Sequence, residues 1–280
     1  MKAKQILTVL LLVLGLSACS NRFVYNNLDW LVHWYLDDYI ELNKVQKQQF
    51  DEVFANWHQW HRAEELPRYQ TQLTELRTEI TSGPMQAEQF IAHMDRGWLH
   101  FVRLREHVAD DIIWLAKQAS DEQIAEFFQA LEEKNAKREK SYLAMTTAEQ
   151  RQDVLDDVEE NLSGYFGRLS AEQKGYVAEY ADTMHANFLA WLEYRRLWQQ
   201  SALALLNQRN TSEDFATRFK QLLVSPESLQ TLQYQQHRTD NRQAYAQLLA
   251  KVQQSLSAKQ QKRVASELDD LIEMLANLAP

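Results

Sequence analysis

Cysteine is almost absent from this sequence of 280 residues, which contains Cys19 and no other. A chain with one thiol cannot form an internal disulfide, so folds held together by disulfide bonds are excluded. The paired-cysteine motifs that bind structural zinc are excluded for the same reason. The role of Cys19 must therefore follow from its position near the N-terminus.

Glycine and proline are also scarce, with six and four residues respectively. Folds built from many short strands need far more of these turn-forming residues. The abundant residues are Gln, Glu, Ala, Leu, Lys and Arg, which favour helices. With 45% hydrophobic and 11% aromatic residues, the chain can bury a core, which argues against global disorder. We therefore predict an all-α fold.

Positive charge is in short supply as well, because the formal net charge is −9. Lys2 and Lys4 are the only charges in residues 1–18, so removal of that segment makes the remaining chain more acidic by two charges. Nucleic acids and anionic lipids require clustered Lys and Arg. We expect neither as a partner.

The N-terminus has the pattern of a signal peptide. After the two lysines comes an apolar run over residues 6–14, too short for a bilayer span but typical of a signal-peptide core. The following Leu16-Ser17-Ala18-Cys19 resembles the lipobox of bacterial lipoproteins, in which two small residues precede a cysteine that becomes acylated. We expect cleavage between Ala18 and Cys19 and lipidation of Cys19. An ordinary secretory signal is the alternative.

These expectations divide the chain into a signal peptide (1–18), a lipidated tether (19–27) and an all-helical periplasmic domain (28–280). Ser20 stands where an aspartate would resemble the inner-membrane retention signal of lipoproteins. By that resemblance we expect the outer membrane, periplasmic face, as the location. The sequence leaves open whether Ser82-Gly83-Pro84 divides the helical domain in two.

Apolar residues recur at steps of three and four along most of the chain, which predicts an elongated bundle of roughly eight to ten helices. A first helix is expected from Leu28 to Leu42. A second, from about Lys44 to Glu65, is expected to stop at Leu66-Pro67. The further expected helices cover Gln86–Lys117, Asp121–Lys140, Ala148–Phe166, Ala171–Gln208, Glu213–Leu223, Glu227–Gln254 and Ala258–Ala276.

A short pattern recurs at several expected helix starts: a small polar residue followed three positions later by glutamine. The glutamines of the five copies are Gln46, Gln123, Gln150, Gln173 and Gln260. This spacing is that of a capping box, in which the two side chains bond each other's backbone amides. The pattern also resembles the Leu-Thr-x-x-Gln signatures of small periplasmic chaperones of the Spy and CpxP type.

A longer resemblance involves several blocks of the mature chain. The blocks are Phe23-Val24-Tyr25-Asn26-Asn27-Leu28-Asp29-Trp30, Tyr35-Leu36-Asp37-Asp38-Tyr39, Trp60-His61-Arg62 and Leu66-Pro67-Arg68-Tyr69. They resemble a family of proteobacterial lipoproteins of unknown function. The resemblance implies a lipobox followed by successive helices, and it implies no catalytic residue.

One polar cluster has the composition of a metal site. His58, His61 and Glu65 recur at helical spacing, and zinc binds imidazole nitrogen and carboxylate oxygen. The order and spacing differ from the His-Glu-x-x-His signature. We prefer an amphipathic helix with Trp57 and Trp60 packed inward and the histidines at the rim, and we expect no metal or other cofactor.

Two further features suggest catalysis only weakly. Adjacent aspartates such as Asp110-Asp111 point about 100° apart on a helix and cannot act together on one bond. Pro226-Glu227-Ser228 resembles the Glu-Ser of lytic transglycosylases, but the Gly-Leu-Met-Gln stretch expected after it is missing. We therefore reject that activity.

The aromatic residues near the N-terminus are the remaining candidates. They could belong to the core, line a partner-binding groove, or seat the first helix at a membrane interface. The candidate partner-binding residues are Trp30, Trp34, Tyr35, Tyr39, Trp57 and Trp60. We expect a non-enzymatic, membrane-tethered interaction or chaperone-like protein with a protein partner or client. The alternatives are a cell-wall-acting or metal-dependent hydrolase and a structural spacer.

Overall fold

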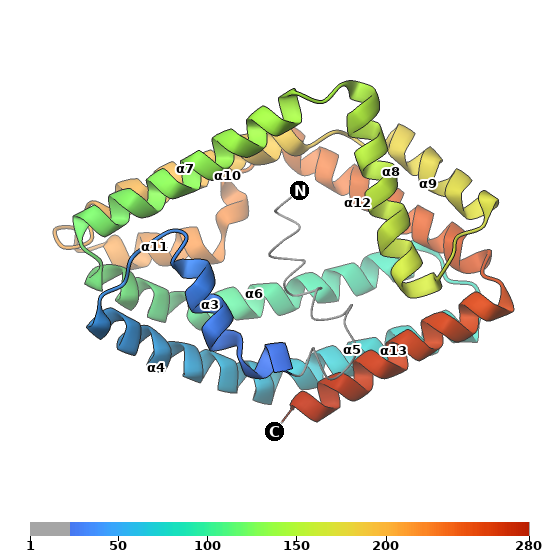
Figure 1. Cartoon of the computed structure of the whole chain (residues 1–280), viewed down its shortest axis with the longest axis horizontal. Coiled ribbons are helices and arrows are strands. Elements are labelled where there is room, and N and C mark those ends of the chain that lie inside the picture. The colour runs from blue at the N-terminus through green and yellow to red at the C-terminus, as the bar shows by residue number, and fades with distance from the viewer. Residues whose placement is uncertain (1–22, 280) are drawn as a thin grey trace.

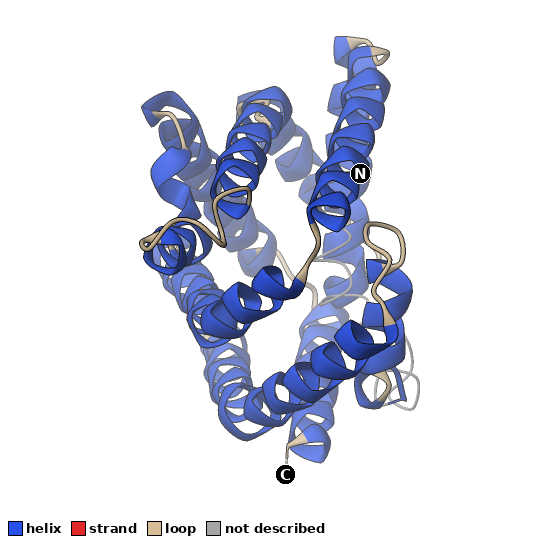
Figure 2. Cartoon of the chain, turned by 90° about the vertical axis from the view of Figure 1, so that its left-hand side faces the viewer, coloured by secondary structure: helices blue, strands red, loops and turns tan. Residues whose placement is uncertain are grey.

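The computed structural model describes residues 23–279 of the chain. The predicted signal peptide, the cleavage site at Ala18, the acylated Cys19 and the first part of the tether lie outside these residues. Within them the structure has eleven α-helices and no strand (Figures 1 and 2), which confirms the all-α prediction. The helix count is one above the predicted range. None of the described helices is long and apolar enough to span a membrane.

The helices follow one another with short connections. Their bounds are α3 Leu28–Leu36, α4 Lys44–Trp60, α5 Leu66–Ser82, α6 Ala87–Gln118, α7 Asp121–Leu143, α8 Thr147–Phe166, α9 Ala171–Thr183, α10 Phe188–Leu206, α11 Phe215–Val224, α12 Leu232–Gln254 and α13 Ala258–Leu278. A π-helical turn, η1, covers His61–Glu65, and a 3₁₀ turn, η2, covers Pro226–Leu229.

The predicted helix end at Leu66-Pro67 is wrong, because α4, η1 and α5 form one helical rod from Lys44 to Ser82. Pro67 lies in the first turn of α5, directly after the π turn. Proline inside a helix lacks a donor and clashes with the preceding turn. The wider π turn removes that conflict, so the rod continues past the proline.

The predicted helix over 171–208 is two helices, and the break between them is a tertiary effect. Asn241 of α12 accepts a hydrogen bond from the backbone N–H of His185 (2.7 Å) and donates one to its carbonyl (2.8 Å). This side chain replaces the helical partners of His185. No glycine or proline marks the break in the sequence.

Two other predicted boundaries also shift. The first predicted helix ends at Leu36 instead of Leu42, in a turn closed by the bond from the N–H of Tyr39 to the carbonyl of Leu36 (2.8 Å). The segment predicted to be helical from Glu227 contains the short turn η2, and α12 starts only after its cap, Thr231.

The predicted capping boxes form at Asn43, Ser120, Ser170 and Ser257. The fifth starts one residue earlier than predicted. Thr146 caps α8 there, and its partner is Glu149, whose carboxylate accepts from the backbone N–H of Thr146 (2.7 Å). A carboxylate at a helix N-terminus is further stabilised by the helix dipole.

The capping glutamines have a second role that links distant helices. Gln46 and Gln123 donate to each other's side-chain oxygen, at 2.9 and 2.8 Å. Gln46 also donates to the carbonyl of Gln118, and Gln123 to that of Glu41. The starts of α4 and α7 are thereby joined by a reciprocal pair of amides, whose nitrogens donate both to the partner and to a backbone carbonyl.

The same arrangement recurs at the starts of α9 and α13. Gln173 and Gln260 donate to each other at 3.3 and 2.9 Å, and also to the carbonyls of Ser255 and Arg168. In both pairs, each accepting carbonyl lies five residues before the partner glutamine. The two glutamine pairs lie at opposite ends of the elongated molecule (Figure 1).

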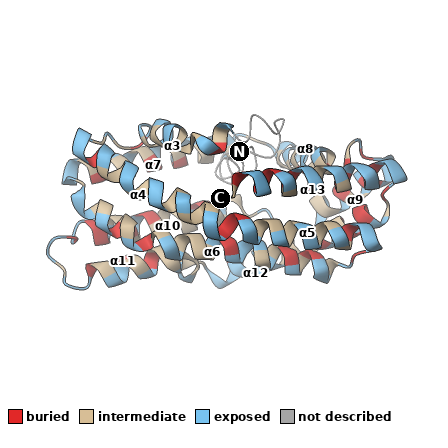
Figure 3. Ribbon diagram, turned by 90° about the horizontal axis from the view of Figure 1, so that it is seen from below, coloured by how far each residue is buried: buried red, intermediate tan, exposed pale blue. Residues whose placement is uncertain are grey.

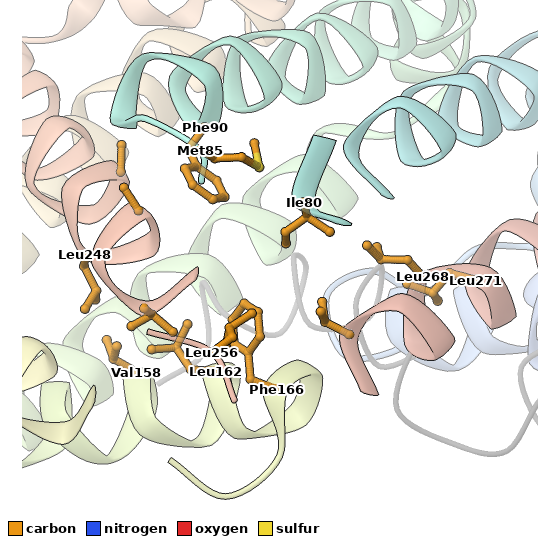
Figure 4. Packing of buried hydrophobic residues seen from close by; sticks show 14 of the residues in the cluster. Ile80, Met85, Phe90, Val158, Leu162, Phe166, Leu248, Leu256, Leu268 and Leu271 are labelled. Carbon is orange, nitrogen blue, oxygen red and sulfur yellow. The ribbon is translucent and has the colours of Figure 1, made fainter. Parts of the chain in front are cut away.

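The buried apolar residues form two clusters. The first is shared by α5, α8, α9, α12, α13 and the start of α6 (Figure 4). The second joins the end of α6 to α7, α10 and α11. Helix α6 contributes Phe90 to the first and Ile113 to the second, which are about 35 Å apart along the helix axis. Buried positions face neighbouring helices along the length of the molecule (Figure 3).

The Gly83-Pro84 link is itself exposed but runs between two residues of the first cluster. Ile80 before it and Met85 after it both belong to that cluster. Gln253 of α12 also donates to the carbonyls of Ile80 and Gly83. These hydrogen bonds hold the link against α12.

Candidate functional site

The residues predicted as metal candidates do not converge. His58 packs against Tyr25 and Phe54, with ring centroids at 4.7 and 6.2 Å. His61 shares a hydrogen bond with the hydroxyl of Tyr25, whereas the carboxylate of Glu65 points to α6. Among the described residues no group of three or more His, Cys, Asp or Glu side chains is placed to hold a metal ion.

Glu65 is instead the centre of a buried polar cluster. Its side chain is fully buried. Arg103 donates to both of its oxygens, at 2.7 and 3.0 Å, and Nδ1 of His100 lies 2.9 Å away. Burial alone would raise the pKa of Glu65, but the hydrogen bonds from Arg103 and His100 outweigh it and hold the pKa below its usual value. Glu65 is thus an ionised anchor with saturated oxygens.

The cluster continues toward the N-terminus through His61. The hydroxyl of Tyr25 shares a hydrogen bond with Nδ1 of His61 (2.8 Å), and Nε2 lies 3.3 Å from the hydroxyl of Tyr69. Burial lowers the pKa of His61 to about 4 and raises that of Tyr69 to about 12. The ring of Tyr69 meets that of His100 edge-on at 4.4 Å.

We call these six residues the Glu65 cluster: Tyr25, His61, Glu65, Tyr69, His100 and Arg103. The cluster lies at the π turn, where the α4–α5 rod is paired with the middle of α6. Because Tyr25 belongs to the segment before α3, the cluster also fixes the N-terminal segment to the body. Asn26 of the same segment accepts a hydrogen bond from the guanidinium of Arg62. Neutral histidines and a paired carboxylate suit structural anchoring.

A groove lies beside the cluster, with a volume of about 520 Å³. Its lining residues are Trp60, Glu64, Glu65, Arg68, Arg103, Glu106 and His107. Trp60 stacks on His107 across it, with ring centroids 3.9 Å apart and planes within 9°. Trp57 donates to Asp111 of α6 (2.7 Å). Both tryptophans predicted as partner-binding residues are therefore used to join α4 to α6.

The aromatic candidates before α4 divide into exposed and buried side chains. Trp30 and Trp34 are 69% and 61% exposed, and Tyr35 is 41% exposed. Tyr39 is buried and lies against Phe127, with the ammonium of Lys134 3.6 Å from its ring centroid. Of the four, only Tyr39 is a core residue.

The paired aspartates point apart, as the helical geometry predicts. Asp110 is paired with Lys220 of α11 (2.7 Å), whereas Asp111 accepts from Trp57 of α4. Glu227, from the rejected transglycosylase motif, pairs with Arg105 (2.7 Å). These carboxylates connect helices to one another.

An exposed aromatic pair on α6 was not identified from the sequence. Trp98 and Phe101 are 41% and 42% exposed, with ring centroids 5.3 Å apart. The guanidinium of Arg105 lies 5.2 and 5.0 Å from the two rings, and its ion pair with Glu227 holds it there. We call Trp98, Phe101 and Arg105 the α6 patch. Their helical spacing is visible in the sequence, but it does not reveal that this face of α6 lacks a covering helix.

Comparison with known proteins gives one match. Residues 38–235 match a family described as "Family of unknown function (DUF6279)". No curated protein and no solved structure matches the chain. The matched range includes the glutamine pair of α4 and α7, most of the Glu65 cluster and the α6 patch. Since it spans more than half of the sequence, the chain belongs to this family of unknown function.

Proposed function

We propose that the protein is a lipoprotein of the outer membrane, facing the periplasm. In this proposal the signal peptide 1–18 is removed after Ala18, and Cys19 carries the lipid. The basic start, the apolar run and Leu16-Ser17-Ala18-Cys19 support it. Several acyl chains give stable attachment, because each buried CH₂ contributes about 0.8 kcal/mol.

Metabolic labelling with a clickable fatty acid tests this anchor. The parent chain is expected to take up the label and to fractionate with outer membranes. The Cys19→Ala variant is expected to remain unlabelled and unprocessed. Equal labelling of the two chains would exclude Cys19 as the acylation site.

We propose further that the helical body is a non-enzymatic interaction or chaperone-like module that binds an envelope protein. The observation that carries this proposal is the α6 patch. Trp and Arg dominate the binding energy of protein interfaces, and exposed aromatic groups on a folded domain mark sites of association. The Arg105 side chain is only 13% exposed and holds the two aromatic rings in place, so less conformational entropy is lost when these rings bind.

The chaperone-like form of this proposal has separate support. The helix starts Leu169-Ser170-Ala171-Glu172-Gln173 and Leu256-Ser257-Ala258-Lys259-Gln260 resemble the Leu-Thr-x-x-Gln signatures of chaperones of the Spy and CpxP type. In this chain their glutamines join two helix starts. The resemblance is confined to these motifs. It supports a similar use of capped helix starts and, with it, a client-binding role.

Photo-crosslinking in the native envelope distinguishes the possible roles. A photoreactive amino acid replaces Trp98 or Phe101 in the α6 patch, and Lys262 on the exposed side of α13 is the matched control position. One dominant adduct from the patch indicates a dedicated partner, and many envelope proteins indicate a chaperone. Adducts equal to those at Lys262 would reject the proposal and favour the hydrolase or the spacer.

A further inference from the structure

The segment from Phe23 to Leu36 has two apolar faces, of which the body covers only one. Residues 23–26 and α3 are both helical and are linked by a turn at Asn27, the N-cap of α3, whose backbone is not helical. Asn27 still donates to the carbonyl of Phe23 (3.1 Å) and accepts from the N–H of Leu31 (3.5 Å). Tyr25 and Leu28 pack on the first core cluster. Phe23 and Trp30 point away from it, each 69% exposed.

The exposed side chains form one stripe. Trp30 and Trp34 are four residues apart on α3, which places them on the same side of that helix, and the exposed Phe23 precedes them across the turn at Asn27. Trp34 is 61% exposed. We call these three residues the α3 stripe. These large aromatic side chains remain exposed to water unless a membrane or another molecule covers them.

The sequence around the stripe limits what can cover it. No lysine or arginine occurs between residues 23 and 43, and Asp29, Asp37 and Asp38 are exposed there. Arg22 directly precedes the stripe, but a single arginine beside three aspartates is no cluster of positive charge, so we expect no electrostatic attraction to an anionic surface as the driving force. Trp is the residue that most favours the headgroup level of a membrane, where its ring is apolar and its N–H remains hydrated.

The stripe begins close in the sequence to Cys19, the residue proposed to carry the lipid. Phe23 follows Cys19 by four residues, which span at most about 14 Å. A lipid on Cys19 therefore holds the start of the stripe at the bilayer surface. The stripe cannot be turned freely, because Tyr25 is bonded to His61 and His33 lies 2.5 Å from Asp51 of α4.

From these observations we propose that the α3 stripe binds the interface of a phospholipid bilayer as a second, non-covalent membrane contact. The segment then lies along the membrane plane, with its rings about 5–10 Å deep. Acylation of Cys19, part of the proposed function, brings the stripe to its target. The covalent lipid and the stripe together would fix the orientation of the helical body, which a flexible tether alone would leave free.

Flotation with lipid vesicles tests the stripe separately from acylation. The chain from Ser20 to Pro280 contains every described residue and lacks the lipid. It is mixed with phosphatidylcholine vesicles and, separately, with vesicles containing phosphatidylglycerol. We expect the chain to bind the phosphatidylcholine vesicles. We expect phosphatidylglycerol to cause no increase in binding and high salt to change binding little.

Two variants show where binding occurs. Trp30→Ala/Trp34→Ala is expected to weaken vesicle partitioning about tenfold or more, since each buried tryptophan contributes a factor of that size. The matched control, Trp98→Ala/Phe101→Ala, removes two aromatic side chains from the α6 patch and is expected to bind like the parent. Circular dichroism and thermal unfolding check that both variants fold.

Three results would overturn the inference: no binding by the parent chain, parent-like binding by Trp30→Ala/Trp34→Ala, or equal loss in the control. A chain that is not acylated in cells but still binds vesicles would instead refute the lipoprotein proposal and leave the stripe intact.

Discussion

At the scale of single residues, the most consequential side chain is Glu65. It is a fully buried carboxylate two residues before Pro67, and its ion-pair partner Arg103 lies 38 positions away in the sequence. Burial of one charge without its partner is unfavourable by several kcal/mol, so both must reach this position together. The Glu65 cluster therefore ties the correct folding of the α4–α5 rod to its pairing with α6.

Glu65→Gln tests this role. The substitution leaves Arg103 without a counter-charge, and we expect it to lower the free energy of unfolding by about 3 kcal/mol in urea titrations. The control is Asp269→Asn, which breaks the exposed pair with Arg77 and is expected to change stability by about 1 kcal/mol or less. Equal effects of the two substitutions would contradict the assignment.

A second residue-scale prediction concerns acid. His61 has a pKa of about 4 in the folded chain and 6.5 when unfolded, so the unfolded chain binds more protons between these values. Stability is therefore complete above pH 6.5 and falls as the pH is lowered toward 4, by on the order of 2–3 kcal/mol. Burial lowers the pKa values of His93 and His100 too, which adds to the same trend.

Urea midpoints measured between pH 7.5 and 4.5 check this. The His61→Gln variant keeps a polar side chain and is expected to show a shallower decline than the parent. Gln129→Ala, at an exposed position on α7 and without a titratable group, is expected to decline as the parent does. A His61→Gln variant with an unchanged pH slope would refute the assignment.

At the scale of elements, helix starts were predictable and their partners were not. Asn43, Ser120, Ser170 and Ser257 lie three residues from their glutamines, so a local pattern is sufficient to predict each cap. That the glutamines pair across 77 and 87 positions depends on the tertiary fold, and no feature of the local sequence predicts it.

The glutamine pairs make an element-scale prediction. Gln173→Ala and Gln260→Ala each leave polar groups unpaired at a buried site, and each is expected to destabilise by about 1–3 kcal/mol. The double variant is expected to lower the free energy of unfolding by less than the sum of the two single effects, with a coupling energy of about 0.5 kcal/mol or more. Gln129→Ala, at an exposed position on α7, is the control. Strict additivity in urea titrations would show that the two glutamines act only as separate caps.

Which of the candidate surfaces are exposed also depends on the tertiary fold, and the local sequence does not predict it. Periodicity predicts a helix with apolar sides from Leu28 to Leu42, but two opposite apolar faces look alike in the sequence. Tyr39 is buried because Phe127 and Lys134 of α7 cover it, and Trp30 is exposed because no helix does. Likewise, the break before α10 depends on Asn241, which is 56 positions from His185.

At the scale of the whole molecule, two core clusters are joined by α6, which contributes buried residues to both. The Glu65 cluster holds the α4–α5 rod against α6 and fixes the N-terminal segment. The glutamine pairs join helix starts at the two ends of the molecule (Figure 1). The α3 stripe and the α6 patch are exposed aromatic surfaces of the described residues. We assign the α3 stripe to the membrane and the α6 patch to an envelope protein.

The most direct test of that division is a comparison of two variants in the native envelope, with each chain photo-crosslinked from one common probe. The probe replaces Leu232, which is 84% exposed at the start of α12 and lies outside both surfaces. We expect Trp98→Ala/Phe101→Ala to lose the protein adducts of the parent and Trp30→Ala/Trp34→Ala to keep them. Unchanged adducts in the α6 variant, or their loss in the α3 variant alone, would contradict the assignment of the two surfaces.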